Sequence, residues 1–280
     1  RVRAGWRRVL AGSSRQSLER KALRPFLERS RWFAGKVRGL RGVKIVDVVS
    51  LNKDADAPVL LLIEPVYPGG SGEWYLLPLD FAAGEQALEI MEKHPQGIVS
   101  RIYVDDTYGV LYDGLYSERF HGLILNVLRG RVKCTGAFGQ VAGSPGALLK
   151  ALRAKSETDL SPRVLKVEQS NSSLLYGSTF FLKLYRKFEE GLNPEPEMIR
   201  YLTEQAGFAA VPSFAGNLEY RRKDGETLIL ALLQQFAASQ NDAWTLTLDV
   251  LQQYFERVLT LSDDPPKPRG AWDSLFSLDH

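Results

Sequence analysis

The stretch FFLKLY places Lys183 in the middle of a run of strand-forming residues. Burying an unpaired ammonium group costs so much free energy that this side chain needs a carboxylate or a phosphate partner. A helix is expected ten residues later, because Asn193 is a good N-cap and Pro194 suits the first helical position. The first turn of that helix offers Glu195 and Glu197. The pattern predicts an ion-paired or anion-binding site at the lysine.

A strand lysine paired with a helix glutamate is the arrangement by which kinase N-lobes hold the α- and β-phosphates of ATP. The preceding segment SNSSLLYGS, residues 170–178, would then form a turn over the phosphates, with serine hydroxyls and backbone N–H groups as donors. The alternative is that Lys183 extends into solvent from an edge strand. Spacing alone favours this alternative, because lysine is common on strands.

Other chemistries have weak support in the sequence. A Walker-type loop, G-x-x-x-x-G-K-[ST], and a G-x-S-x-G nucleophile elbow do not occur, and GAFGQVAG is interpreted as a turn. The single Cys134 excludes an intrachain disulfide, and with only three histidines metal catalysis by this chain is not expected. His121 has the character of a packing residue on a helix.

The composition is that of a globular protein, with 44% hydrophobic and 25% charged residues. No apolar run approaches the roughly 20 residues that span a bilayer, and the N-terminus lacks a signal-peptide core. Because residue 1 is not Met, we expect a cytoplasmic fragment of a longer protein without a membrane partner.

The net charge of +3 hides an asymmetry between the two ends of the chain. Residues 1–44 hold 14 Lys/Arg and 2 Asp/Glu, whereas the rest holds 22 and 31. Basic arms are one signature of nucleic-acid binding, but aromatic residues are few here and the basic residues follow a helical pattern. We expect this face to dock on an acidic surface and expect no nucleic-acid partner.

The hydrophobic periodicity predicts two units. The first has an amphipathic helix over 16–30 that Pro25 kinks, strands at 43–51, 58–67 and 73–81, and a helix at 84–93. The second has strands at 163–169, 173–177, 179–186 and 227–236, and helices at 117–128, 193–207 and 247–261.

Several separated motifs, taken in order, resemble the bacterial maltokinases, which belong to the aminoglycoside-phosphotransferase-like kinases. They are RWFAGK, LYDGLYSERF, EQSNSSLLYG, FFLKLYRKFEEGLNPEPEMIRYLTE, VPSFAGNLEYR and LLQQFAASQNDAWTLTLDVLQQYFE. The resemblance covers about residues 16–260. It implies phosphorylation of maltose to maltose 1-phosphate, with ATP and Mg²⁺ as cofactors, on a route from trehalose to glycogen or α-glucan.

The resemblance also implies which residues bind the nucleotide. Lys183 would hold phosphates, a turn would cover them, and a hinge would meet the adenine through its backbone. The residues concerned are Lys183, Glu197, Ser172, Ser173, Gly177, Gln235, Phe236 and Ala237. The N-P-x-x-E motif selects Glu197 as the partner of Lys183, whereas helical spacing selects Glu195. The motif is preferred, and Glu195 stays the second choice.

The fold implied is α+β: a small α+β N-terminal cap module, a kinase-like N-lobe with an antiparallel sheet and one key helix, and the first helix of a truncated C-lobe. The expected boundaries are 1–20 for a linker from a preceding domain, 21–107 for the cap, 108–242 for the N-lobe and 243–280 for the start of the C-lobe. No H-x-D catalytic loop occurs. The catalytic base and the metal ligands are therefore expected after His280, with no catalytic or metal-binding residue within this chain, which alone would be inactive.

The N-terminal GWRRVLAGSSRQSLE resembles the linker of fusions in which a maltokinase follows trehalose synthase. Trehalose synthase is therefore an expected partner, covalently fused or associated, beside the substrates ATP and maltose. Two alternatives remain open: a bifunctional trehalose synthase/maltokinase, and a non-catalytic docking module with the kinase fold. Other small-molecule kinases of this fold lack the RWFAGK stretch.

Overall fold

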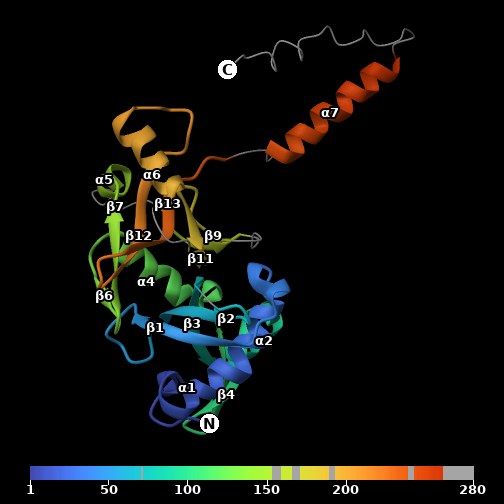
Figure 1. Ribbon diagram of the computed structural model, residues 1–280. Coiled ribbons are helices and arrows are strands. Elements are labelled where there is room, and N and C mark those ends of the chain that lie inside the picture. Colours follow the sequence, from blue (N-terminus) through green and yellow to red (C-terminus); the bar gives the residue numbers. More distant parts are fainter. Residues whose placement is uncertain (71, 153–158, 166–170, 189–192, 239–242, 261–280) are drawn as a thin grey trace. The chain divides into compact units, whose positions relative to one another are not determined.

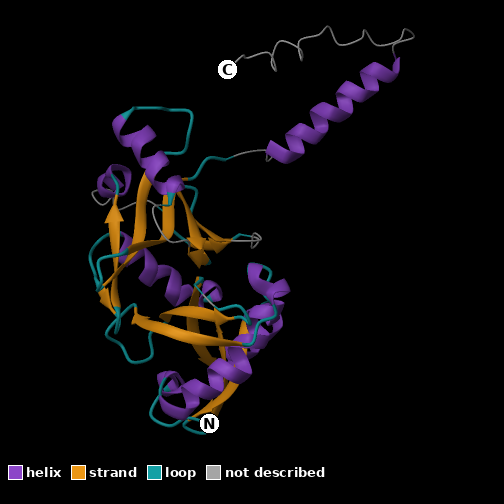
Figure 2. Cartoon of the chain, in the orientation of Figure 1, coloured by secondary structure: helices purple, strands orange, loops and turns teal. Residues whose placement is uncertain are grey.

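The computed structural model describes residues 1–70, 72–152, 159–165, 171–188, 193–238 and 243–260 (Figure 1). The chain divides into two compact units, Arg1–Phe236 and Ala237–His280. The first unit has mixed helices and strands, and the paired strands of its sheets are antiparallel (Figure 2). The expected α+β class is confirmed.

The first sheet belongs to the N-terminal half of the first unit. Its strands follow the order β1-β2-β3-β5-β4. The short strand β11 lies outside this order and pairs with β3. Strands β1 to β3 confirm the three strands predicted here. The bounds are β1 Gly42–Ser50, β2 Val59–Val66, β3 Trp74–Ala83, β4 Ile98–Val104, β5 Thr107–Asp113 and β11 Lys187–Phe188.

One face of the first sheet is covered by the N-terminal helical segment. This run comprises α1 Gly12–Leu18, the π-helical turn η2 Glu19–Leu23 and α2 Arg24–Arg29. It confirms the predicted helix, and the wider π turn lies just before Pro25, which cannot donate a helical hydrogen bond. Leu23, Phe26 and Leu27 are buried against the sheet.

The second sheet follows the order β6-β7-β12-β13-β10-β9-β8. In the segment GAFGQVAG, residues 136–138 form the turn between β6 and β7, as expected. Residues 139–143 belong to the strand β7, and for them the expectation of a turn is wrong. The bounds are β6 Cys134–Thr135, β7 Gly139–Pro145, β8 Pro162–Val164, β9 Asn171–Tyr176, β10 Phe180–Tyr185, β12 Phe214–Arg222 and β13 Thr227–Gln235.

The remaining helices include those predicted at 84–93, 117–128, 193–207 and 247–261. The α-helices are α3 Gly84–Lys93, α4 Glu118–Leu128, α5 Ala147–Leu152, α6 Pro194–Arg200 and α7 Ala243–Thr260, the last in the second unit. The shorter helical turns are η1 Trp6–Leu10, η3 Ala34–Arg38, η4 Pro95–Gly97, η5 Gly114–Tyr116 and η6 Tyr201–Gln205.

A continuous apolar core joins the two sheets of the first unit. It contains Leu60 and Leu76 of the first sheet, Phe120 of α4, and Leu182 and Leu218 of the second sheet. Helix α4 lies between the layers (Figure 1). Each sheet therefore buries one face in a shared core, which leaves the other face of the second sheet available for other contacts.

His121 on α4 has the packing role expected for it. Only 4% of the residue is exposed, its Nε2 lies 2.6 Å from the carbonyl oxygen of Leu115, and Nδ1 has no hydrogen-bond partner among the described residues. Burial lowers the pKa of His121. The ring is therefore neutral in the folded protein near pH 7, and Nε2 donates to the carbonyl.

We expect His121 to make folding less stable at acid pH. The unfolded chain takes up the proton first, near the ordinary histidine pKa of 6.5, so stability present above that pH is lost as the pH falls below it. Urea unfolding at pH 7.5 and 5.5 measures this loss, at most about 1.4 kcal/mol per pH unit. The variant His121→Gln keeps a donor and should lose less; an equal loss in both proteins would contradict the assignment.

Candidate functional site

Lys183 lies on β10, whose residues alternate between the two faces of the second sheet. Leu182 and Leu184 are fully buried on the core face, whereas the Lys183 side chain belongs to the opposite face and is 22% exposed. Its register partners are Ser173 on β9 and Leu232 on β13. Because β10 has a neighbour on each side, the interpretation of Lys183 as an edge-strand residue is wrong.

The ammonium group of Lys183 is held by a carboxylate at the start of α6. Nζ donates to both oxygens of Glu195 at 2.8 Å, and the hydroxyl of Tyr185 donates to the same carboxylate at 2.9 Å. Asn193 caps the helix by accepting a hydrogen bond from the backbone N–H of Glu195 at 3.1 Å. Burial and the neighbouring carboxylate raise the pKa of Tyr185, so its hydroxyl remains a donor.

The partner of Lys183 is therefore Glu195, and the predicted pairing with Glu197 is corrected. Residues four apart lie on the same side of a helix, and Ile199 packs against Tyr185 and other side chains on the Lys183 face of the second sheet. Glu195 shares that side. Glu197, two residues on, is exposed. A contribution of Glu197 to nucleotide binding stays a prediction.

The segment predicted to turn over the phosphates is mostly the strand β9. Ser172 lies on the core face, fully buried, and its hydroxyl accepts a hydrogen bond from Nε of Arg186 at 2.8 Å. Gly177 lies five residues further on, about 16 Å along an extended strand. The two residues therefore do not form one turn.

Ser173 and Gly177, two of the residues predicted to cover the phosphates, have different structural roles. Ser173 faces the same side as Lys183, its register partner, and its buried hydroxyl has no hydrogen-bond partner among the described residues. Gly177 has φ +56°, and a Cβ there would lie 2.1 Å from the carbonyl oxygen of Asp159. The glycine is thus required by the β9–β10 turn, whereas Ser173 is placed near the ammonium group.

The predicted hinge, Gln235 to Ala237, begins at the end of β13. The N–H of Gln235 donates to the carbonyl of Ser213 and the N–H of Phe236 to that of Thr179, both at 2.8 Å. These two backbone N–H groups therefore already donate hydrogen bonds within the protein. Ala237 begins the second unit, and the binding of adenine at this segment stays a prediction.

The first sheet and its surroundings match a known domain family. Residues 26–116 match the family described as the maltokinase N-terminal cap domain. This segment is therefore similar to the cap domain of maltokinases, and we call it the cap. The matched cap includes β1 to β5, α3 and the end of α2.

The chain is also similar to three solved structures of glucosamine kinase: one complex with glucosamine, ADP and inorganic phosphate, and two crystal forms. Sequence identity is 12%, 13% and 11%, and the TM-scores are 0.48, 0.45 and 0.46. The matches cover 84%, 78% and 80% of this chain, and 44%, 40% and 42% of theirs. The chain thus spans less than half the length of those kinases.

A buried ion pair that the sequence analysis missed joins the cap to Arg186, the residue that directly follows β10. The side chain of Arg186 is 0% exposed, and that of Asp113, which belongs to the cap, is 4% exposed. The Nη2 atom of Arg186 lies 2.7 Å from the Oδ2 atom of Asp113. The guanidinium also lies 4.8 Å from the ring centroid of Trp32. The sequence contains a pattern that could have indicated this ion pair. Strand alternation puts Arg186 on the same face as Leu182 and Leu184, where a buried charge needs a partner.

A second buried carboxylate ties the cap to the far side of the second sheet. Asp47, at a β-bulge of β1, accepts hydrogen bonds from the N–H groups of Ala137 and Phe138 at 2.8 and 3.0 Å and from the hydroxyl of Tyr220 at 2.7 Å. Together with the β11–β3 pairing, these contacts join the cap to the strand of Lys183 and its neighbours.

Within the described ranges, no group of three or more His, Cys, Asp or Glu side chains is placed to hold a metal ion. In the same part of the chain, no helix has both the length and the apolar character needed to cross a membrane.

Proposed function

We propose that this chain is the cap and the ATP-binding lobe of a maltokinase, which transfers the γ-phosphoryl group of ATP to maltose and forms maltose 1-phosphate. The observation that carries the proposal is the Lys183–Glu195 pair, held on the open face of a sheet that is attached to a maltokinase-type cap. The expected domain boundaries and the hinge at Gln235–Ala237 are part of the proposal.

In this function Lys183 binds and neutralises the α- and β-phosphates. The two hydrogen bonds from Nζ to Glu195 fix the position of the ammonium group before ATP arrives. Tyr185, which donates to the same carboxylate, fixes the carboxylate in turn. A preorganised charge of this kind stabilises the transition state without reorganisation during the reaction.

The transfer itself needs groups that we assign to residues outside this chain. The sugar hydroxyl oxygen forms a bond to the γ-phosphorus, the bond from that phosphorus to the β–γ bridging oxygen breaks, and ADP leaves. A general base takes the hydroxyl proton. Mg²⁺ would add positive charge at the phosphates, but near Lys183 the carboxylate of Glu195 is already engaged by two donors. We propose that the metal ligands, like the base, come from the C-lobe residues expected after His280.

The proposal extends to the setting of the reaction. The resemblance of the N-terminal segment supports a trehalose synthase fused to or associated with the kinase, in the cytoplasm, on a route from trehalose to glycogen. The alternative is a docking module of the kinase fold with an inactive nucleotide face. Binding of ATP separates these two functions.

We expect Glu195→Gln to weaken ATP binding by about fivefold or more, because the neutral amide no longer holds the ammonium group as an ion pair. Calorimetric titration of ATP into the 280-residue protein measures the effect. Glu197→Gln makes the same change two residues away and tests the motif-based prediction for Glu197: a Kd within about twofold would assign the effect to Glu195 alone.

The titration also tests the function as a whole. Equal effects of the two substitutions would contradict the role of Glu195. If millimolar ATP does not bind the unmutated chain, the docking module replaces the ATP-binding lobe as the better description.

A further inference from the structure

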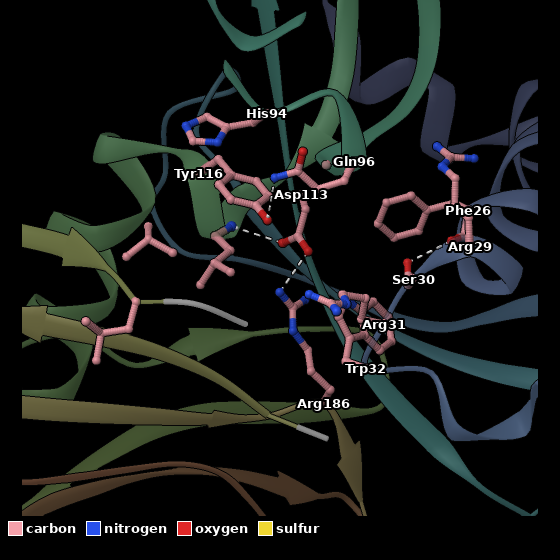
Figure 3. A pocket seen from close by; sticks show the side chains of 14 residues that line it. Phe26, Arg29, Ser30, Arg31, Trp32, His94, Gln96, Asp113, Tyr116 and Arg186 are labelled. Carbon is pink, nitrogen blue, oxygen red and sulfur yellow. Dashed lines mark hydrogen bonds and ion pairs between the residues drawn. The ribbon is translucent and has the colours of Figure 1, made fainter. Parts of the chain in front are cut away.

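A cavity of about 460 Å³ opens between the cap and the second sheet (Figure 3). Its walls come from the end of α2, the segment around Gln96, the Asp113–Tyr116 segment, and Val164 and Leu165 at the end of β8. Its size falls in the range of small-molecule sites. Lys183 and Glu195 are not part of it: Arg186, which lines the cavity, lies on the opposite face of the β10 chain from Lys183.

The lining carries an excess of positive charge. It holds Arg29, Arg31 and Arg186 against Asp113 alone among the carboxylates. The buried Arg186–Asp113 pair neutralises itself, and Figure 3 shows the two side chains directed at one another. Because burial lowers the pKa of His94, this imidazole adds no charge near pH 7. The two remaining arginines, Arg29 and Arg31, therefore give the cavity lining its net positive charge.

Neither of those arginines has a carboxylate partner in the described part of the chain. Arg29 donates to the backbone carbonyl of Ile98 and lies 5.2 Å from the ring centroid of Phe26. Arg31 is exposed and makes no hydrogen bond or ion pair with any described residue. Guanidinium groups that line a cavity without a carboxylate partner are suited to bind phosphate groups.

The rest of the lining offers flat rings and an amide. The rings of His94 and Tyr116 are stacked, with centroids 4.3 Å apart and planes 16° apart. Gln96 donates from Nε2 to the hydroxyl of Tyr116 at 3.2 Å, which leaves its carbonyl oxygen as an acceptor. Trp32 closes another side. Ring faces beside a few polar atoms suit a ligand that has both an apolar face and hydroxyl groups.

We propose that this cavity is a second ligand site, separate from the nucleotide face, and that its ligand is a phosphorylated sugar. Arg29 and Arg31 bind the phosphate group. The aromatic rings contact the carbon face of the sugar ring, and Gln96 accepts a hydrogen bond from a hydroxyl group. This site goes beyond the proposed kinase function, which uses the other face of the second sheet.

Calorimetric titration of the 280-residue protein with glucose 1-phosphate as the probe tests the proposal. We expect a submillimolar Kd, and binding at least tenfold weaker for glucose and for inorganic phosphate, each of which offers half of the contacts. The variant Arg31→Gln, and the double variant Arg29→Gln/Arg31→Gln, should weaken glucose 1-phosphate binding by tenfold or more.

Arg20→Gln is the matched control, because Arg20 is exposed on the same helical segment and lies outside the cavity; its Kd should stay within twofold. The single Arg31 variant removes no described contact, so it should fold normally. The proposal is overturned if glucose 1-phosphate fails to bind at 10 mM, if glucose or inorganic phosphate binds equally well, or if Arg31→Gln has no effect.

A further pair of measurements separates this site from the nucleotide face. Lys183→Met should leave glucose 1-phosphate binding within twofold, and Arg31→Gln should leave ATP binding within twofold. Loss of sugar phosphate binding in Lys183→Met alone would place that ligand at the nucleotide face and refute the second site. Failure of ATP to bind a chain that still binds glucose 1-phosphate would refute the kinase function alone.

Discussion

Lys183→Met is expected to reduce kcat/KM for ATP by about 10³-fold or more in the complete enzyme. Methionine keeps the length and the apolar stem of the side chain but removes the charge that we propose binds the phosphates of ATP. It also leaves the carboxylate of Glu195 without its ammonium partner. Steady-state kinetics with maltose held at saturation and ATP varied gives the ratio directly.

Lys187→Met provides a matched control for this result. Lys187 lies four residues further along the same chain segment and pairs with Glu73 of the cap at 3.0 Å. Its described ion pair is with Glu73 and not with Glu195, so kcat/KM should stay within about fivefold. Activity of Lys183→Met within tenfold of the unmutated enzyme would refute the phosphate-binding role.

How far the sequence predicts this site depends on how local each contact is. The position of Lys183 in a strand and the helix start at Asn193 follow from neighbouring residues, and the structure confirms both. The choice between Glu195 and Glu197 was also local. Helical spacing favoured Glu195, which shares a side with Ile199, and the structure agrees with spacing, whereas the motif gave the wrong partner.

The serine-rich segment shows why turn chemistry can mislead. Its small polar residues favour a turn, whereas its apolar residues predict a strand at 173–177. The pairing of Leu174 and Tyr176 with β10 confirms the strand. The strand β7 presents the same conflict through its glycines. A Cβ at Gly143 would lie 2.1 Å from the carbonyl oxygen of Val127. That glycine serves the close approach of α4 to the strand, which no local pattern reveals.

The contacts that join the cap to the second sheet are the hardest to predict from sequence patterns. Arg186 and Asp113 are 73 residues apart in the chain, and Asp47 is 173 residues from Tyr220. Alternation along a strand indicates that a buried charge needs a partner, but it does not identify that partner. Only the docking of the two sheets brings the two groups together.

We expect Arg186→Met to lower the free energy of unfolding by about 3–5 kcal/mol. The substitution removes the guanidinium that binds Asp113, Ser172 and the face of Trp32. It leaves the carboxylate of Asp113 buried, with the N–H of Leu115 at 3.0 Å as its remaining described donor. An uncompensated buried charge is far costlier than the loss of the pair itself. Equilibrium unfolding in urea, followed by tryptophan fluorescence, measures the difference.

The double variant Arg186→Met/Asp113→Leu distinguishes an uncompensated charge from lost packing. If the unpaired carboxylate causes most of the destabilisation, removing it as well should restore a large part of the lost free energy, because an apolar pair can replace a buried ion pair at little cost. Arg24→Met, which breaks the exposed pair with Glu28, should cost less than about 1 kcal/mol. A double variant no more stable than Arg186→Met would mean that the packing of Arg186 against Trp32, not its charge, joins the cap to the strand of Lys183.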